Sequence, residues 1–121
     1  MRGVIVFAHG SRDPLWRKPV EAVAAQIRTT DPKTLVTCAY LELSEPDLPT
    51  AVDDLVRQGA THIRLLPLFF GMGKHAREDL PVLMAQLGAS HPSIRFERLT
   101  PAGEDPRLTA LLAQIALESA P

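Results

Sequence analysis

Cysteine is almost absent from this chain of 121 residues, since Cys38 is the only one. No disulfide can form within the chain, and this usage is consistent with a reducing compartment. Charge of one sign is not in excess either, because 13 basic residues balance 14 acidic ones for a net charge of −1. The chain therefore lacks the basic footprint of proteins that bind nucleic acid or a membrane surface.

Long apolar runs and targeting patterns are missing too. No window of the sequence approaches the ~18 apolar residues of a membrane-spanning helix. The first residues lack the charged, apolar and small-residue segments of a secretory signal. We therefore expect a soluble, cytoplasmic, globular protein with no nucleic-acid or membrane partner. Its length predicts a single domain, residues 1–121. A domain of this size buries roughly two-thirds of its unfolded surface, which supports a core without disulfides.

Several nucleotide-binding and hydrolase motifs are also absent. The sequence has neither the GxGxxG of dinucleotide-binding folds nor the GxxxxGK[ST] of P-loop proteins, and "GMGKH" at 71–75 lacks the P-loop spacing. The "HGS" at 9–11 is similar to an oxyanion loop of α/β-hydrolases, but the GxSxG nucleophile elbow is missing. We expect no nucleotide or organic cofactor.

What the sequence does contain is a regular alternation of two kinds of segment. Four apolar, β-branched segments at 4–8, 34–42, 62–70 and 93–99 alternate with four segments of helical spacing. Successive βα units predict a parallel sheet. The predicted fold is α/β: a three-layer, flavodoxin-like domain with a four-stranded parallel sheet in the order 2-1-3-4 and helices on both faces.

Capping residues and prolines predict where the helices begin and end. Pro67 fits the strand pattern poorly, because proline rarely occurs inside a central strand. The helix boundaries predicted from the sequence are Asp13-Pro14 to Asp31-Pro32, a start within "SEPDL" with Pro46 near the first turn to Gly59, Asp79 (as the cap) to Gly88, and a last helix starting near Asp105-Pro106.

Ligands of open parallel sheets bind at the carboxyl ends of the strands, so the polar residues after each predicted strand are the functional candidates. The other two histidines, His62 and His91, precede strands and belong to the opposite edge. The residues expected at the carboxyl edge are His9, Ser11 and Arg12 after the first strand, Glu42 at the end of the second, Lys74, His75 and Arg77 after the third, and Thr100 and Glu104 after the fourth.

His9, Glu42 and His75 form a candidate metal site at this edge. Two imidazoles and a carboxylate suit a borderline divalent transition metal such as cobalt, nickel, iron or zinc. Three protein ligands leave coordination positions open for exchange. Each residue also has a plainer explanation. A histidine at such an edge is more often a capping or hydrogen-bonding residue, and Glu42 precedes a helix start, where acids are solvated or act in caps.

The segment around His75 is unusual because Gly71 and Gly73 flank Met72 just before it. Two glycines allow a mobile or tightly turned loop. Met72 is either an exposed apolar contact for a flat ligand or a filler beneath a helix. Three further residues fit packing positions, with Cys38 as a small buried hydrophobe and Trp16 and Met84 on helix faces.

Three stretches together resemble a known family. They are "VIVFAHGSR" at 4–12, "AYLELSEPDL" at 39–48 and "IRLLPLFFGMGKHAREDLP" at 63–81. In this order, each at a predicted strand end, they are similar to the small CbiX-type sirohydrochlorin cobaltochelatases, which belong to the class II chelatases. The motifs run from about Gly3 to Pro81, and the rest of the chain matches in length and βα pattern.

The resemblance implies a chelatase-like α/β fold. It implies ATP-independent insertion of a divalent metal into sirohydrochlorin or a related tetrapyrrole, in cobalamin- or siroheme-type biosynthesis. The metal would be a substrate, with cobalt first and nickel or iron as alternatives. By motif position, His9 and His75 match the metal-binding and catalytic histidines of the family, and Glu42 matches an acidic residue that joins the site. Short members with one such domain pair as homodimers, so a homodimer is expected.

Sirohydrochlorin carries many carboxylates, which basic side chains bind through charge-assisted hydrogen bonds. The expected substrate-binding residues are Ser11, Arg12, Met72, Lys74 and Arg77. Two other function classes remain open. One is a metal- or tetrapyrrole-binding module without turnover, and the other is an α/β module whose edge histidines are structural. The choice among cobalt, nickel and iron is also open, because imidazole and carboxylate ligands accept all three.

Overall fold

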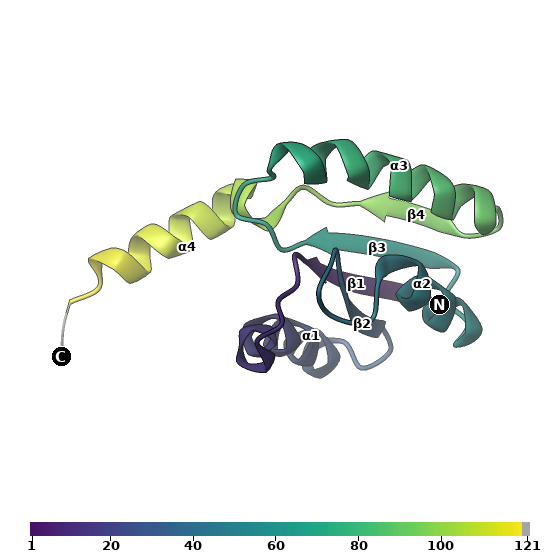
Figure 1. The fold of residues 1–121 in the computed structure, drawn as a ribbon. Helices are drawn as coiled ribbons and strands as arrows, with labels where there is room; N and C mark the ends of the chain where they lie inside the picture. The colour runs from purple at the N-terminus through teal and green to yellow at the C-terminus, as the bar shows by residue number, and fades with distance from the viewer. Residues whose placement is uncertain (120–121) are drawn as a thin grey trace.

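A computed structural model describes residues 1–119; positions 120 and 121 of the predicted domain lie outside the described residues. Four strands form one parallel sheet: β1 (Arg2–Ala8), β2 (Leu35–Tyr40), β3 (His62–Pro67) and β4 (Arg95–Arg98). Their order is β2-β1-β3-β4 (Figure 1). The predicted fold class and strand order are confirmed.

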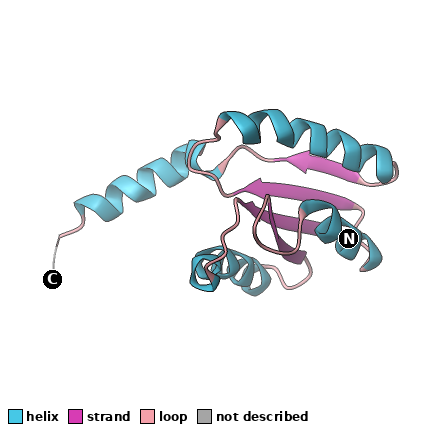
Figure 2. Cartoon of the chain, in the orientation of Figure 1, coloured by secondary structure: helices cyan, strands magenta, loops and turns pink. Residues whose placement is uncertain are grey.

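The central strand β1 is buried on both faces. Ile5 and Phe7 pack under α2 (Leu48–Arg57) and α3 (Lys74–Ser90), while Val6 and Ala8 pack under α1 (Lys18–Thr30). Figure 2 shows helices on both sides of the strands. Side chains of a strand alternate between its faces, so a strand covered on both sides reads as a continuous apolar run. Burial of each large side chain contributes roughly 1.5–3 kcal/mol.

The first two helices begin at aspartate caps. The Asp13 carboxylate accepts from the Leu15 N–H at 2.9 Å and starts a 3-10 helix, η1 (Pro14–Arg17), that leads directly into α1. The Asp47 carboxylate accepts from the Thr50 N–H at 3.0 Å at the start of α2. Pro46 directly precedes this cap, near the first turn of α2 as predicted, and it follows a cis peptide bond. The prolines in the first turns are Pro14 of η1, Pro19 of α1 and Pro49 of α2.

Helix α3 starts at Lys74, five residues before the cap predicted at Asp79, and runs past Gly88 to Ser90. Ala76 and Leu80 already lie on its buried stripe, so core packing extends the helix backwards from the predicted start. Asp79 resembles a cap because Pro81 follows it closely, and Pro81 lies inside the helix. The prediction was wrong because the local cap signal is weaker than the burial of that stripe.

Pro67 is the last residue of β3, and the segment at 68–70 that the sequence suggested as strand lies beyond it. The Leu68 N–H donates to the Phe7 carbonyl at 2.7 Å. Because hydrogen-bonding groups of a strand alternate in direction, the backbone nitrogen of Pro67 faces β4 instead of β1. The last β4 pairing is Leu65 with Arg98. The missing N–H of proline therefore falls where the β3–β4 ladder ends.

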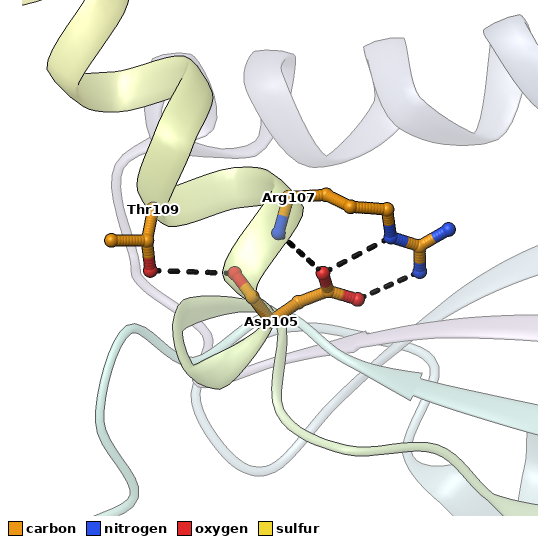
Figure 3. A network of polar contacts seen from close by, with 3 residues as sticks. All are labelled: Asp105, Arg107 and Thr109. Carbon is orange, nitrogen blue, oxygen red and sulfur yellow. Dashed lines mark hydrogen bonds and ion pairs between the residues drawn. The ribbon is translucent and has the colours of Figure 1, made fainter.

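The chain leaves β4 through a second 3-10 helix, η2 (Ala102–Glu104), and ends in α4 (Pro106–Leu117). The helix begins where the sequence predicted, with Asp105 as its cap, and Figure 3 shows the contacts of Asp105 with Arg107 and Thr109. Figure 1 shows α4 extending away from the sheet instead of lying in a helix layer. Among residues 1–119, no helix is long and apolar enough to cross a membrane.

Candidate functional site

The loops that follow β1 and β2 are joined at the carboxyl edge of the sheet. The Leu41 N–H donates to the Ala8 carbonyl, and the Glu42 N–H donates to the His9 carbonyl, each at 2.9 Å. Gly10 lies at this junction with φ +109°, and a methyl group added to it would overlap the Glu42 carbonyl. The close approach of His9 and Glu42 therefore depends on glycine at position 10.

Ser11 and Ser44 make a second link between the same loops. The Ser44 hydroxyl donates to the Ser11 carbonyl at 2.7 Å and accepts from the Ser11 N–H at 3.1 Å. The Ser11 hydroxyl itself accepts from the Asp13 N–H at 3.1 Å. Ser11, expected as a substrate contact, thus uses its backbone and its hydroxyl to hold the loop that presents His9.

The His9 ring is held against a buried aromatic residue. It meets Phe69 edge to face, with ring centroids 5.2 Å apart and planes at 89°. Phe69 in turn packs edge-on against Phe7, at 5.9 Å. Because Phe69 follows β3, this contact brings the exit of β3 next to that of β1. The His9 side chain remains exposed to solvent, so its imidazole is oriented by the core and accessible to a ligand.

His75 lies in the first turn of α3, not in the loop that the glycines suggested. Gly73 caps the helix with extended backbone, and its carbonyl accepts from the Arg77 N–H at 3.0 Å. Lys74, His75 and Arg77 are all exposed to solvent. The helix gives His75 a fixed backbone position, and the glycines Gly71 and Gly73 lie before it.

The structure joins two of the three candidate ligands by backbone contact and presents the third from a different element. His9 and Glu42 are adjacent through their loops, whereas His75 comes from α3, and all three are exposed. Within residues 1–119, no three His, Cys, Asp or Glu side chains gather closely enough to hold a metal ion. The described part of one chain therefore presents separate donors at an open edge, and no closed cage.

His62 and His91 lie at the other edge, as predicted. His62 opens β3, and His91 follows the last turn of α3, where its ring lies 3.0 Å from the Asp53 carboxylate. These two histidines serve as natural controls, because they share the chemistry of His9 and His75 without their location.

A hollow of about 520 Å³ opens beside the joined loops. It contains Arg12, which the sequence indicated, and Arg17, which it did not. Arg17 ends η1, and only the hydrogen-bonded start of that helix places it on the same side as Arg12. Two guanidinium groups in one hollow suit carboxylate groups of a ligand. The residues that line the hollow are Ser11, Arg12, Pro14, Arg17, Leu43, Ser44 and Glu45.

Two apolar side chains at this edge were not predicted from the sequence as candidate residues. Phe70 is 74% exposed, and Leu43 is 53% exposed with φ +63°. The Gly103 N–H donates to the Phe69 carbonyl at 2.9 Å, so the backbone is held just before Phe70. Met72, expected as a substrate contact, is half-buried and packs against the main core. The sequence could have indicated that Phe70 is exposed, because neighbouring residues of an extended segment point to opposite sides and Phe69 is buried.

Comparison with known proteins gives consistent results. The family model described as CbiX matches residues 3–119. The sirohydrochlorin cobaltochelatase of Sulfolobus acidocaldarius is 30% identical over 116 residues, covering 96% of this chain and 90% of that one. The sirohydrochlorin ferrochelatase of Bacillus subtilis is 29% identical, covering 86% of this chain and 40% of its own length. A crystal structure described as a CbiX protein of cobalamin biosynthesis from Marinobacter aquaeolei superposes with a TM-score of 0.82 at 31% identity, covering 96% of this chain and 94% of that one.

The matched lengths differ among the relatives. The chain spans 40% to 64% of three of the curated chelatases, which come from Bacillus subtilis, Methanococcus aeolicus and Methanocaldococcus jannaschii. The family match, in contrast, runs through nearly the whole chain and includes all three stretches whose resemblance was noted in the sequence. This chain belongs to the CbiX family.

Proposed function

We propose that this chain catalyses the insertion of a divalent metal into sirohydrochlorin or a closely related tetrapyrrole, without ATP. Relatives named as sirohydrochlorin chelatases support the reaction class. The observation that carries the proposal is the held, exposed imidazole of His9 beside Glu42. A chelatase needs donors that replace water on the metal and yet leave it a face open to the macrocycle.

Insertion joins one divalent ion to four ring nitrogens and releases two pyrrole protons. Neutral imidazoles are both metal ligands and proton acceptors near neutral pH. In the proposed mechanism, His9 and Glu42 receive the metal substrate, and His75 on α3 acts as a further ligand or takes a pyrrole proton. The two positive charges of the entering ion are balanced by the two protons that leave, and the proposed reaction uses no nucleotide or organic cofactor.

Substrate binding is proposed for the charged and apolar groups around this edge. Arg12 and Arg17 would bind peripheral carboxylates of the tetrapyrrole from their shared hollow. Lys74 and Arg77 extend the basic rim from α3. The exposed ring of Phe70 offers an apolar face for the flat macrocycle. Leu43, Ser11 and the exposed part of Met72 complete the proposed contacts.

Cobalt is the metal we propose first, with iron and nickel as alternatives. The named relatives include both cobalt and iron chelatases, and imidazole and carboxylate donors do not choose strongly between these ions. The corresponding place in metabolism is cobalamin- or siroheme-type biosynthesis. Homodimer formation by a domain covering 1–121 and a cytoplasmic location are further parts of the proposal.

One observation favours a second candidate function. The described residues of one chain form no three-ligand metal group, as would suit a module that binds a tetrapyrrole without turnover. The two functions differ in stoichiometry. A chelatase produces many equivalents of metallated tetrapyrrole per chain, whereas a binding module saturates at about one.

The test is an absorbance assay of sirohydrochlorin with Co²⁺, Ni²⁺ or Fe²⁺, run with the protein and against a protein-free blank, because metals also insert unaided. We expect multiple turnovers, and a loss of at least tenfold in His9→Ala and His75→Ala. His91→Ala, at the opposite edge, is the matched control and should keep wild-type turnover. Rates equal to the blank for the wild type, with metal or tetrapyrrole binding intact, would support the binding module instead.

A further inference from the structure

Helix α4 has the composition of a buried helix but does not occupy a buried position. From Leu108 to Leu117 it carries no charged residue, and none of its residues, all within the described range, is buried. Leu112, Ile115 and Leu117 are 39%, 57% and 83% exposed. A helix that is apolar on all sides is normally enclosed by protein, so the described chain leaves this helix without its partner.

The face of the sheet that packs against α1 has an uncovered apolar surface that could receive such a helix. On the face opposite α2 and α3, α1 covers β1 and β2, but no helix within residues 1–119 packs over β3 and β4. A groove of about 480 Å³ lies beside α1 over β1 and β3, and it reaches Leu99 directly after β4. Its apolar lining comes from the sheet and from the inner side of α1: Val4, Val23, Ile27, Leu66 and Leu99.

The charges in the groove are compatible with a helix that carries none. Arg64 and Glu97 neutralise each other on the sheet at 3.2 Å, and Arg2 and Asp31 are of opposite sign among the residues that line the groove. An uncharged helix can cover this surface without leaving a new buried charge unpaired. A charged amphipathic helix would fit less well.

The chain's own α4 is held away from this groove. The Gly103 N–H donates to the Phe69 carbonyl, and a methyl group at Gly103 would overlap the Phe70 carbonyl, so η2 is tightly docked. Asp105 then fixes the first turn of α4, accepting from the Arg107 N–H at 2.8 Å and from its guanidinium at 2.7 Å (Figure 3). Folding α4 back would break this docked exit.

We propose that α4 fills the groove between α1 and β3 of a second copy of the chain, in a reciprocal exchange. The first turns of α4 border a second hollow, of about 620 Å³, together with Leu66 and Leu99. Because both hollows share Arg64, Leu66 and Leu99, an entering helix would lie along the sheet next to the α4 of the receiving chain. Contact on two sides explains why α4 is apolar all round.

The exchange also reaches the size that a stable dimer needs. A helix of 12 residues is ~18 Å long, and half of its surface is ~300 Å². One α4 and the groove that receives it together bury ~600 Å². A reciprocal exchange has two such contacts and buries ~1,200 Å², the lower end of standard protein interfaces. The inference rests on the homodimer of the proposed function and adds the surfaces that pair. Its tests measure molecular mass and cross-chain pairing, so they can fail while the proposed catalysis stands.

The first test compares mass in solution by light scattering after gel filtration. Wild type should have the mass of two chains, and the double variant Leu112→Glu/Ile115→Glu that of one, with its circular dichroism retained apart from α4. Because α4 adds no buried residue to the described core, these changes should not unfold the sheet. Val82→Glu, the same kind of change at an exposed position of α3, is the control and should remain dimeric. A monomeric wild type, or a dimeric double variant, overturns the proposal.

The second test identifies where α4 of one chain binds on the other chain. In a Cys38→Ser background, chains with Ile115→Cys are mixed with chains carrying Gln26→Cys, Ile27→Cys or Thr30→Cys, all at groove-lining positions, and then oxidised. We expect a disulfide between the two kinds of chain for at least one groove position. A dimer without any such cross-chain disulfide, or a disulfide formed only within a chain that carries both changes, overturns the exchange.

Discussion

The backbone N–H of Glu42 donates to the carbonyl oxygen of His9 at 2.9 Å, across two loops that are separated by more than thirty positions in the sequence. This bond follows directly on the bond from the Leu41 N–H to the Ala8 carbonyl, which ends the regular β1–β2 pairing. It places an imidazole-bearing residue and a carboxylate-bearing residue side by side at the carboxyl edge. The candidate site therefore begins where the regular hydrogen bonding between β1 and β2 ends.

Gly10 is expected to be essential for this junction. Gly10→Ala places a methyl group against the Glu42 carbonyl and also strains a residue with φ +109°. Gly59→Ala is the matched control, since Gly59 has φ +104° and nothing within 4 Å of an added methyl. The control should lose about 1–2 kcal/mol in the free energy of unfolding from conformation alone. Gly10→Ala should lose clearly more, as measured by urea denaturation. Equal losses would show that the two loops separate easily.

Arg12 is expected to act in substrate binding. A charge-assisted hydrogen bond contributes about 1.5–3 kcal/mol, so Arg12→Glu should raise the KM for sirohydrochlorin at least tenfold and leave kcat nearly unchanged. Arg57→Glu changes a basic residue at the end of α2 and should leave KM as it is. Kinetics at varied tetrapyrrole concentration measure both. An unchanged KM in Arg12→Glu would make Arg12 an ordinary solvated charge.

Asp105 is expected to titrate at unusually low pH. Hydrogen bonds from the side chain and then the backbone N–H of Arg107 lower the pKa of Asp105 to about 2, from its ordinary 3.8. Because the folded-state pKa is depressed, the carboxylate stabilises the start of α4 above about pH 4. That contribution is lost as the pH falls from about 4 to 2.

The titration of Asp105 is measured by NMR of its carboxyl carbon, alongside helical circular dichroism between pH 5 and 2. Arg107→Gln removes the guanidinium contact, keeps the backbone N–H, and should move the midpoint upward. A wild-type midpoint at 3.8 or above would contradict the cap described for α4.

Cys38 is expected to be a slow nucleophile. Burial raises the pKa of its thiol, and the side chain lies under α1 with its sulfur near the Val20 carbonyl. Less thiolate and less access should both slow alkylation. Iodoacetamide at pH 8 should react severalfold more slowly with native protein than with protein in guanidinium chloride. Ala89→Cys in a Cys38→Ser background, exposed on α3, should react at the denatured rate. A native Cys38 that reacted as fast would indicate frequent opening of α1.

Several features followed from local sequence patterns. The apolar run of β1, the caps Asp13 and Asp105, and the alternation of strands and helices are all visible in short windows. The order of the strands also followed, because right-handed connections allow few arrangements of four βα units. From that order alone, His9, Glu42 and His75 were expected at one edge, with His62 and His91 at the other.

Features that depend on contacts between distant segments could not be predicted in this way. The start of α3 at Lys74 depends on the burial of Ala76 and Leu80 against the sheet. Arg17 joins Arg12 in one hollow only after η1 has formed. No window of the sequence contains these relationships, because each involves residues brought together by folding.

The sequence by itself thus determined the fold class, the edge of the sheet where the candidate residues lie and the family of the chain, since periodicity and motifs are local and survive without coordinates. The tertiary structure decided how His9 is oriented by Phe69, which glycine allows Glu42 to approach, and that α4 lies away from the sheet. These depend on packing and backbone direction, which arise only when β1, β2, β3 and η2 lie together.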